Sequence, residues 1–276
     1  MIPENKEVPI SVIMGVYNPG DRESLEQAID SILQQTCESF EFIIYDDASC
    51  ERDAALLREL AAKDGRIRLL RGEENHGLAH ALNECLKEAK GTYIARMDAD
   101  DVSVPARLQT QMDFLESHKE WAFVGLSAQL FDAQGVWGRR QMAVTPGERE
   151  FLRYSPYVHP TVMFRKEVLS EAGGYLDSED TRRCEDYELF MRLYCLGKYG
   201  CNIDGDLFFY REDRDWYDKR KLRQRIAESK IRYCGFRKMG LLSLKNMIYV
   251  GKPVLMMLIP KIIRKRIRNK KVKMTT

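Results

Sequence analysis

The 276-residue sequence lacks several features that mark secreted, disulfide-rich or membrane-spanning proteins. Its seven cysteines are scattered and form no Cys-x-x-Cys pair, which argues against a disulfide framework. No uninterrupted apolar run reaches the roughly 18 residues that a spanning helix requires. The first nine residues, MIPENKEVP, show no basic segment followed by an apolar one, so no secretory signal is expected. These absences predict a protein of the reducing cytoplasm that is soluble or peripheral to a membrane.

The two common glycine-rich phosphate loops are also missing. The turn after the first apolar segment reads Gly15-Val16-Tyr17-Asn18-Pro19-Gly20, which is not the Gly-x-Gly-x-x-Gly of dinucleotide-binding domains. No Gly-x-x-x-x-Gly-Lys-Ser/Thr loop occurs anywhere in the chain. NAD-dependent enzymes and nucleotidyltransferases are therefore disfavoured. Any phosphate-bearing ligand must be held by other groups.

Acidic residues are absent from the C-terminal end. The chain has a formal net charge of +2, and residues 261–276 hold eight basic and no acidic residues, so the remainder carries −6. Before this tail, the apolar stretch 247–263 is broken by Gly251, Pro253 and Pro260. Basic residues beside an interrupted apolar segment favour attachment to an anionic membrane surface over a disordered end or a nucleic-acid contact. No nucleic-acid partner is expected, since no nucleic-acid motif occurs and the body is acidic.

Apolar, β-branched segments alternate with amphipathic ones through the first hundred residues. This alternation predicts an α/β fold with a mainly parallel sheet that helices cover on both faces. Residues 127–140 show no clear pattern, and long basic helical segments begin at Trp216. We predict strands at 10–16, 40–45, 67–70, 93–97, 121–126 and 203–210, and helices at 25–33, 53–63, 77–89, 105–117, 168–172 and 184–193.

The most informative stretch is 93–101, YIARMDADD, where an apolar run ends in three carboxylates. Side chains alternate along an extended chain, so Asp98 and Asp100 are expected on one face and Asp101 on the other. Neighbouring carboxylates need a cation or protons. Oxygen ligands without His or Cys favour Mg²⁺ or Mn²⁺, ions that often bridge to phosphate oxygens. Because open α/β sheets bind ligands at the carboxyl ends of their strands, this position predicts a metal site for a diphosphate rather than a solvated acidic turn.

Several other short motifs occur in a fixed order along the chain. They are Gly15-Val16-Tyr17-Asn18, Asp46-Asp47-Ala48-Ser49, Asn75-His76-Gly77-Leu78-Ala79, Asp98-Ala99-Asp100-Asp101, His159-Pro160-Thr161, Gly173-Gly174-Tyr175 and Glu185-Asp186. With these motifs the sequence resembles family 2 glycosyltransferases of the bacterial capsule and exopolysaccharide type, over roughly residues 10–211.

The resemblance implies a GT-A fold in residues 1–215, with a nucleotide-binding half at about 8–101 and an acceptor half at about 102–215. A helical extension with a membrane-associating basic tail would follow at 216–276. The implied activity is an inverting, metal-dependent transfer of a sugar from a nucleotide-diphosphate donor, expected to be a UDP-sugar. The acceptor would be a hydroxyl of a growing surface glycan, expected to be lipid-linked, at the inner face of the bacterial cell membrane.

The resemblance also implies roles for single residues. Asp186 would be the general base, and Asp100 with Asp98 would hold Mn²⁺ or Mg²⁺. Asp98 would also contact the ribose. The remaining expected residues are Val16 and Tyr17 beside the base, Asp46 on the uracil, Asp47, Asn75 and Gly77 in the nucleotide site, and Glu185 and His159 as acceptor-side or supporting groups.

Two departures from the family pattern stand out. Ala48 replaces the glycine of the usual Asp-Asp-Gly-Ser, a change that matters only if the backbone there has positive φ. Many relatives carry a His after the Tyr-Arg that ends the last strand, whereas Glu212 and Asp213 follow here. No metal or acceptor role for such a His is therefore expected.

Two rival functions remain open at this point. A processive polysaccharide synthase would resemble this family but would carry a Gln-x-x-Arg-Trp motif and spanning helices, and the sequence has neither. The other rival is a nucleotide-sugar-binding or scaffold protein of an assembly complex that has lost catalysis. Retention of Asp98, Asp100 and Asp186 weighs against it.

Overall fold

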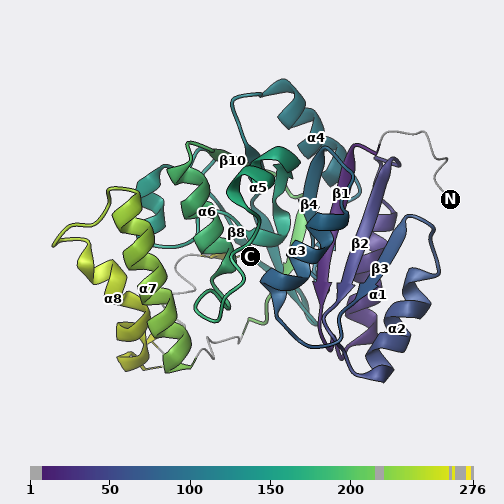
Figure 1. Ribbon diagram of the computed structural model, residues 1–276, viewed down its shortest axis with the longest axis horizontal. Coiled ribbons are helices and arrows are strands. Elements are labelled where there is room, and N and C mark those ends of the chain that lie inside the picture. Colours follow the sequence, from purple (N-terminus) through teal and green to yellow (C-terminus); the bar gives the residue numbers. More distant parts are fainter. Residues whose placement is uncertain (1–7, 215–220, 261–262, 265–271, 275–276) are drawn as a thin grey trace.

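The larger sheet has seven strands and forms the centre of the molecule. A computed structural model describes residues 8–214, 221–260, 263–264 and 272–274 (Figure 1). The strand order is β10-β6-β9-β4-β1-β2-β3, and β9 alone runs antiparallel to its neighbours within this sheet. The predicted α/β fold with a mainly parallel sheet is confirmed. The strands are β1 (Ile10–Val16), β2 (Phe40–Asp46), β3 (Ile67–Arg71), β4 (Tyr93–Arg96), β6 (Phe123–Leu126), β9 (Met163–Arg165) and β10 (Gly200–Ile203).

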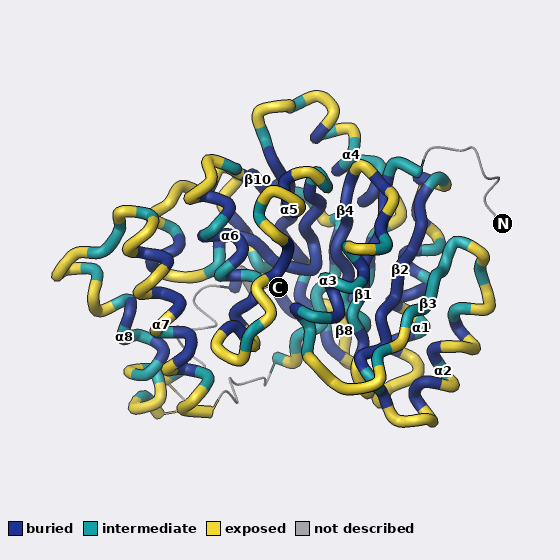
Figure 2. The backbone as a smooth tube through the Cα atoms, viewed as in Figure 1, coloured by how far each residue is buried: buried dark blue, intermediate teal, exposed yellow. Residues whose placement is uncertain are grey.

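Helices cover both faces of this sheet. Successive residues of a strand point to opposite faces, and here the residues on both faces are apolar and need to be buried. Ile13 packs on the face covered by α3, α5 and α6, whereas Val12 and Met14 pack against α1, α2 and α4. Figure 2 shows the strands as the buried layer between these helices. The helices are α1 (Arg22–Leu33), α2 (Glu51–Ala61), α3 (Leu78–Glu88), α4 (Arg107–Ser117), α5 (Lys166–Ala172) and α6 (Glu185–Cys195).

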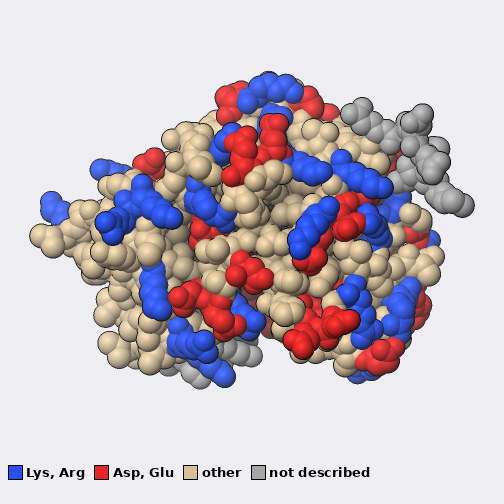
Figure 3. Space-filling model, viewed as in Figure 1, with Lys and Arg blue, Asp and Glu red and all other residues tan. Residues whose placement is uncertain are grey.

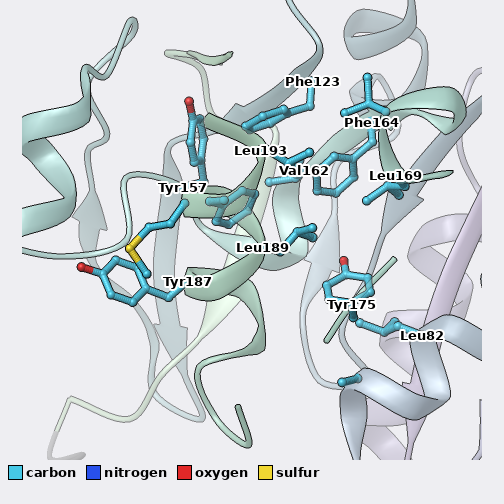
Figure 4. Packing of buried hydrophobic residues seen from close by; sticks show 14 of the residues in the cluster. Leu82, Phe123, Tyr157, Val162, Phe164, Leu169, Tyr175, Tyr187, Leu189 and Leu193 are labelled. Carbon is cyan, nitrogen blue, oxygen red and sulfur yellow. The ribbon is translucent and has the colours of Figure 1, made fainter. Parts of the chain in front are cut away.

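Aromatic residues fill the core beneath α6. The ring of Phe123 on β6 stacks on Phe190 of α6 with centroids 5.5 Å apart, and Phe164 of β9 lies beside both. Figure 4 shows Leu189 and Leu193 of the same helix pointing into this cluster. This packing fixes α6, and therefore the Glu185-Asp186 pair at its first turn, against the end of the sheet.

A second sheet has five strands, in the order β12-β8-β7-β11-β5. The unassigned region 127–140 is the hairpin β7–β8. The predicted strand at 203–210 is wrong, because the chain leaves β10 at Ile203 and enters β11 in the other sheet at Phe208. Between them the sequence Asp204-Gly205-Asp206 is rich in turn formers. The strands are β5 (Val102–Ser103), β7 (Ala128–Asp132), β8 (Gly135–Arg140), β11 (Phe208–Arg211) and β12 (Lys273–Met274).

The C-terminal extension shares the core of the main body. α7 (Leu222–Lys238) and α8 (Met247–Leu255) pack on each other at the end of the molecule opposite α2 (Figure 1). Ile231 and Phe236 of α7 lie in the same cluster as α6. The division of the chain near residue 215 stays a prediction. Short 3₁₀ helices complete the described elements at η1 (Glu148–Leu152), η2 (His159–Thr161) and η3 (Met256–Leu258).

Most of the basic tail lies outside the described residues. Within it, β12 pairs with β8, and Val272 is buried against Leu130 and Trp137. Among the described helices, none combines the length and the apolar character needed to cross a bilayer. All seven cysteines are free thiols.

Candidate active site

A cleft of about 520 Å³ opens at the carboxyl ends of β1 and β2. Its walls come from five separate parts of the chain. They include Val16, Tyr17, Asp47, Asn75 and Gly77 on the nucleotide-binding half, and Asp177, Ser178, Thr181, Arg182, Arg183, Glu185 and Gln224 opposite them. Six of the residues expected in the site therefore share one cavity. Gln224 on α7 was not expected, and no motif in the sequence marks it.

Asp47 fixes the shape of this cleft rather than offering a free carboxylate. Its side chain is buried and accepts hydrogen bonds from Asn75 Nδ2 at 2.7 Å, from His76 N at 3.0 Å and from Gly77 N at 2.7 Å. Gly77 has φ +97°, a conformation that favours glycine, and leads directly into α3. Asp47 thereby holds the loop that begins α3 at the rim of the cleft.

Asp46 is also buried and already engaged. One carboxylate oxygen accepts the Ser49 N–H at 2.8 Å, and Arg71 Nε lies 3.6 Å from the other. Asp46 does not line the cleft described above. Between Asp47 and Ser49, Ala48 adopts φ +61°, so the backbone does have the positive φ for which the family uses glycine.

We expect Ala48→Gly to stabilise the protein. A non-glycine residue in the left-handed region is strained by about 1–2 kcal/mol, and glycine recovers part of this while adding flexibility to the unfolded chain. The expected net gain is about 0.5–1 kcal/mol, or a Tm rise of about 1–3 °C in calorimetry. Ala55→Gly on the exposed face of α2 is the matched control and should lower stability by about 1 kcal/mol. Equal losses in both variants would contradict the strain at residue 48.

Three carboxylates meet beyond the end of β4. Oxygens of Asp98, Asp100 and Asp101 lie within 4.8 Å of one another. The expectation that Asp101 points away from the other two is wrong, because β4 ends at Arg96 and the chain turns at Ala99 and Asp100. The alternation of an extended strand no longer applies in this turn.

The negative charge of these three carboxylates is not fully compensated by positive groups around them. Asp101 is buried and accepts the Arg211 N–H at 2.8 Å, yet its Oδ2 has no hydrogen-bond partner among the described residues. Burial and the charges of Asp98 and Asp100 raise the pKa of Asp101 well above its ordinary value. Desolvation and the charge of Asp98 raise the pKa of Asp100, the exposed member, to about 6. An oxygen-only set of this kind fits Mg²⁺ or Mn²⁺.

Arg96 lies between the acidic cluster and α6. Its guanidinium is buried and pairs with Asp98, and its Nε and Nη1 have no partner among the described residues. Its charge also opposes the rise in the pKa of Glu185 that burial causes. Arg96 was not expected in the site, although an arginine within an otherwise apolar stretch is visible in the sequence.

Glu185 and Asp186 begin α6. Glu185 is buried, and its burial with the charge of Asp186 raises its pKa to about 7. Asp186 is half-buried and does not line the cleft. Carboxylates in a first helical turn are favoured by the helix dipole, which accounts for the local sequence.

His159 supports this region from beneath. It is buried in η2, and its Nε2 lies 2.8 Å from the hydroxyl of Tyr175. Burial and the charge of Arg96 hold the pKa of His159 well below its usual value, so the ring is neutral. This position suits a packing role. At the end of β11, Glu212 pairs with Arg140 at 2.6 Å.

This fold and this acidic cluster at the strand ends define a GT-A glycosyltransferase. The model of the family described as Glycosyl transferase family 2 matches residues 11–173. The chain belongs to this family and is a family 2 glycosyltransferase.

The similarity to two bacterial relatives extends over most of the chain. It is 35% identical to the putative glycosyltransferase EpsE of Bacillus subtilis (strain 168), over 97% of this chain and 96% of that protein. It is 30% identical to the amylovoran biosynthesis glycosyltransferase AmsE of Erwinia amylovora, over 76% of this chain and 79% of that protein.

Solved structures share the fold at low sequence identity. TarS of S. aureus in complex with UDP-GlcNAc matches with a TM-score of 0.65 at 16% identity, covering 89% of this chain and 71% of that one. The mannosyltransferase PcManGT from Pyrobaculum calidifontis, in complex with GDP-Man and Mn²⁺, matches with a TM-score of 0.61 at 18% identity, covering 91% and 75%.

Proposed function

We propose that this protein transfers a sugar from a nucleotide-diphosphate donor to a hydroxyl of a growing surface glycan, with inversion at the anomeric carbon. The observation that carries the proposal is the cluster of Asp98, Asp100 and Asp101 within 4.8 Å, one oxygen of which lacks a partner among the described residues. Such a cluster needs a cation, and a hard divalent ion bridges naturally to a diphosphate. The neighbouring cleft offers room for the nucleoside.

The donor is proposed to be a UDP-sugar that lies along the nucleotide-binding half. Val16 and Tyr17 would contact the base, and Asp47 would act through the loop it holds at Asn75 and Gly77. Asp46 is proposed to bind the uracil. The donors named for the structural neighbours are UDP-GlcNAc for TarS and GDP-Man for PcManGT, so both uridine and guanosine nucleotides belong in a test.

In the proposed mechanism, Asp186 accepts the proton of the acceptor hydroxyl while that oxygen attacks the anomeric carbon opposite the leaving diphosphate. The hydroxyl becomes acidic as its bond to carbon forms, so a weakly basic carboxylate suffices. Asp98 and Asp100, with Asp101 beside them, would hold Mg²⁺ or Mn²⁺. The bound ion would supply Lewis-acid compensation for charge on the departing diphosphate. Arg96 pairs with Asp98 of this cluster.

The acceptor is proposed to be a lipid-linked oligosaccharide of exopolysaccharide synthesis. AmsE is named for amylovoran biosynthesis, and the similarity to EpsE covers nearly the whole of both chains. A lipid-linked acceptor requires the enzyme to work at the inner face of the bacterial cell membrane.

Calorimetric titration tests the donor site. UDP and GDP are titrated into the protein with and without Mn²⁺, and NAD serves as the control ligand. We expect one nucleoside diphosphate to bind only with Mn²⁺, and NAD not to bind. A protein that binds neither diphosphate under either condition would contradict the proposed donor site.

The rival function, a scaffold that has lost catalysis, predicts a different pattern. Such a protein would bind the nucleotide but would neither transfer nor hydrolyse any nucleotide-sugar. Mass spectrometry of UDP-sugars and GDP-mannose incubated with the protein and Mn²⁺ separates the two. Release of UDP or GDP at a rate above the protein-free control would exclude the scaffold.

The proposed membrane surface is the extension with its basic tail. No acidic residue follows Glu228, whereas 14 Lys or Arg residues do. Apolar side chains of this region are open to solvent, with Leu244 94%, Ile248 62% and Leu258 81% exposed. Apolar side chains beside cations match the interfacial region of an anionic bilayer.

Neutralising four tail residues to Gln is expected to release the protein from anionic vesicles. At about 1 kcal/mol for each basic residue near the surface, the loss is about 4 kcal/mol, or about 10³-fold in partition coefficient. This change leaves β12 and the buried Val272 in place, which deletion of 261–276 would not. The substituted residues are Lys265, Arg266, Arg268 and Lys270.

Sedimentation with phosphatidylglycerol-containing vesicles measures this binding, and phosphatidylcholine vesicles give the background. The matched control removes four exposed cations from α1, α2 and their neighbourhood, at the far end of the molecule, and should bind as the wild type does. Equal binding of the tail variant and the wild type would disprove the membrane role of the tail. The control substitutions to Gln are at Arg22, Arg52, Arg58 and Lys63.

A further inference from the structure

The segment 176–184, which leads into α6, forms the wall of the cleft opposite Asn75 and Gly77. Its charges are almost entirely paired. Asp177 lies 3.1 Å from His80 Nδ1, Glu179 pairs with Arg182 at 3.0 Å, and Asp180 lies 3.4 Å from Lys230. Figure 3 shows basic and acidic side chains interspersed in the same way over this face of the molecule. Each acidic residue of the segment thus has a partner side chain beside it.

Arg183 is the exception. It is exposed and lines the cleft, and its guanidinium has no hydrogen bond or ion pair with any residue that the structure describes. The neighbouring carboxylates of Glu179 and Asp180 are taken by other cations. One positive charge is therefore available to a ligand in the cleft.

The backbone of Arg183 is held in an unfavourable conformation. Its φ is +67°, and the other non-glycine residues of the described chain with positive φ, Asn18 and Ala48, directly follow Tyr17 and Asp47 of the same cleft. Strain of this kind persists where the surroundings enforce it, often at binding sites. The backbone amide of Arg183 also opposes the rise in the pKa of the Glu185 carboxylate. Arg183 therefore lies beside the pair of carboxylates that begins α6.

We propose that Arg183 binds a phosphate oxygen of one of the two substrates. A guanidinium presents paired N–H donors that match a phosphate group, and it keeps its charge at any working pH. The phosphate belongs either to the diphosphate of the donor or to the diphosphate that links the acceptor sugar to its lipid. This inference rests on the proposed function, since both phosphates come from it.

Binding measurements with two phosphate probes test this assignment. UDP with Mn²⁺ represents the donor, and farnesyl diphosphate in detergent micelles represents the lipid-linked acceptor. Uridine and farnesol, which lack phosphate, are the matched ligands. Arg183→Gln removes the cation, and Arg183→Gly removes it while relieving the backbone strain, so the two variants separate charge from folding. Arg183→Lys restores the charge without the paired donors.

We expect the Gln and Gly variants to bind one of the two phosphate probes at least tenfold more weakly, and the Lys variant to recover part of the loss. A loss confined to UDP assigns Arg183 to the donor, and a loss confined to farnesyl diphosphate assigns it to the acceptor. The control is Arg223→Gln, which removes a cation that pairs with Glu179 and does not line the cleft. This control should bind both probes as the wild type does.

Dissociation constants within twofold of the wild type for both probes in both neutral variants would overturn the role of Arg183. Wild-type protein that binds neither UDP nor, in a parallel titration, GDP overturns the proposed donor site. The lipid probe then decides the role of Arg183 by itself. Absence of binding to every phosphate probe overturns both proposals.

Discussion

Replacing Asp186 by Asn is expected to lower the rate of glycosyl transfer by about 10²- to 10⁴-fold, the usual contribution of a general base. The amide keeps the shape of the side chain but cannot accept the proton of the acceptor hydroxyl. Asp186 does not line the nucleotide cleft, so the affinity for the donor should stay within about twofold of the wild type. Steady-state kinetics and a nucleotide titration on the same preparation measure both quantities.

The matched control is Glu188→Gln on the same helix. Glu188 pairs with Arg192 at 2.8 Å and lies outside the cleft, so its loss should change the transfer rate by less than about threefold. If the Asp186→Asn enzyme retained the wild-type rate of transfer, Asp186 would not be the general base.

Glu185 is the structural competitor for the same role, because it lines the cleft and has a pKa of about 7. If Glu185 were the base, kcat/KM would rise with pH through about 7, and Glu185→Gln rather than Asp186→Asn would abolish the reaction. With Asp186 as the base, Glu185→Gln should retain most of the activity. The two variants together identify the base.

The pH dependence of the free energy of unfolding gives an independent test of the raised pKa of Glu185. Because its folded-state pKa lies above the ordinary 4.5, the folded protein holds a proton that the unfolded chain releases between about pH 4.5 and 7. The wild type is therefore penalised as the pH rises through this window, by about 3 kcal/mol at pH 8. Glu185→Gln should raise Tm at pH 8 and have little effect at pH 4. If the difference in Tm between Glu185→Gln and the wild type were the same at pH 4 and pH 8, the raised pKa of Glu185 would be contradicted.

Local sequence patterns were sufficient for β1, β2, β3, β4 and β6 of the central sheet, because each of these strands is a single apolar segment that ends at a turn. The same reasoning failed at Ile203 and Phe208, where the apolar run continues on both sides of a turn but the chain moves to another sheet. Periodicity reports which residues are buried and not which sheet buries them. The turn residues between them carried the missing information.

The residues of the candidate site also fall into two groups, those that local sequence motifs predict and those that only the tertiary structure reveals. Residues of strand ends and loops, such as Val16 and Gly77, belong to motifs that short-range reasoning can find. Gln224 and Arg96 depend on tertiary packing, since one reaches the cleft from a helix more than a hundred residues from Gly77 and the other acquires its role from the carboxylates that fold around it. The placement of Asp101 required the turn after β4, which a strand pattern cannot predict.

Removing one carboxylate of the acidic cluster should have opposite effects with and without metal. Asp100→Asn removes a carboxylate whose pKa desolvation and the charge of Asp98 raise to about 6, so the metal-free variant should be at least as stable as the metal-free wild type. The same change removes a proposed ligand. Loss of supporting residues around a metal site costs about 10- to 100-fold in affinity, and loss of a direct ligand should cost about 100-fold or more.

Two measurements test these opposite effects of Asp100→Asn on metal-free stability and on metal binding. Mn²⁺ should raise the Tm of the wild type by mass action, and the rise should vanish in Asp100→Asn. Calorimetry should show Mn²⁺-dependent UDP binding in the wild type and none in the variant. Asp113→Asn, which removes an exposed carboxylate outside the cluster, is the matched control and should respond to Mn²⁺ as the wild type does. An equal Mn²⁺ response in Asp100→Asn would place the ion elsewhere, and the mechanism would then lose its account of how the diphosphate departs.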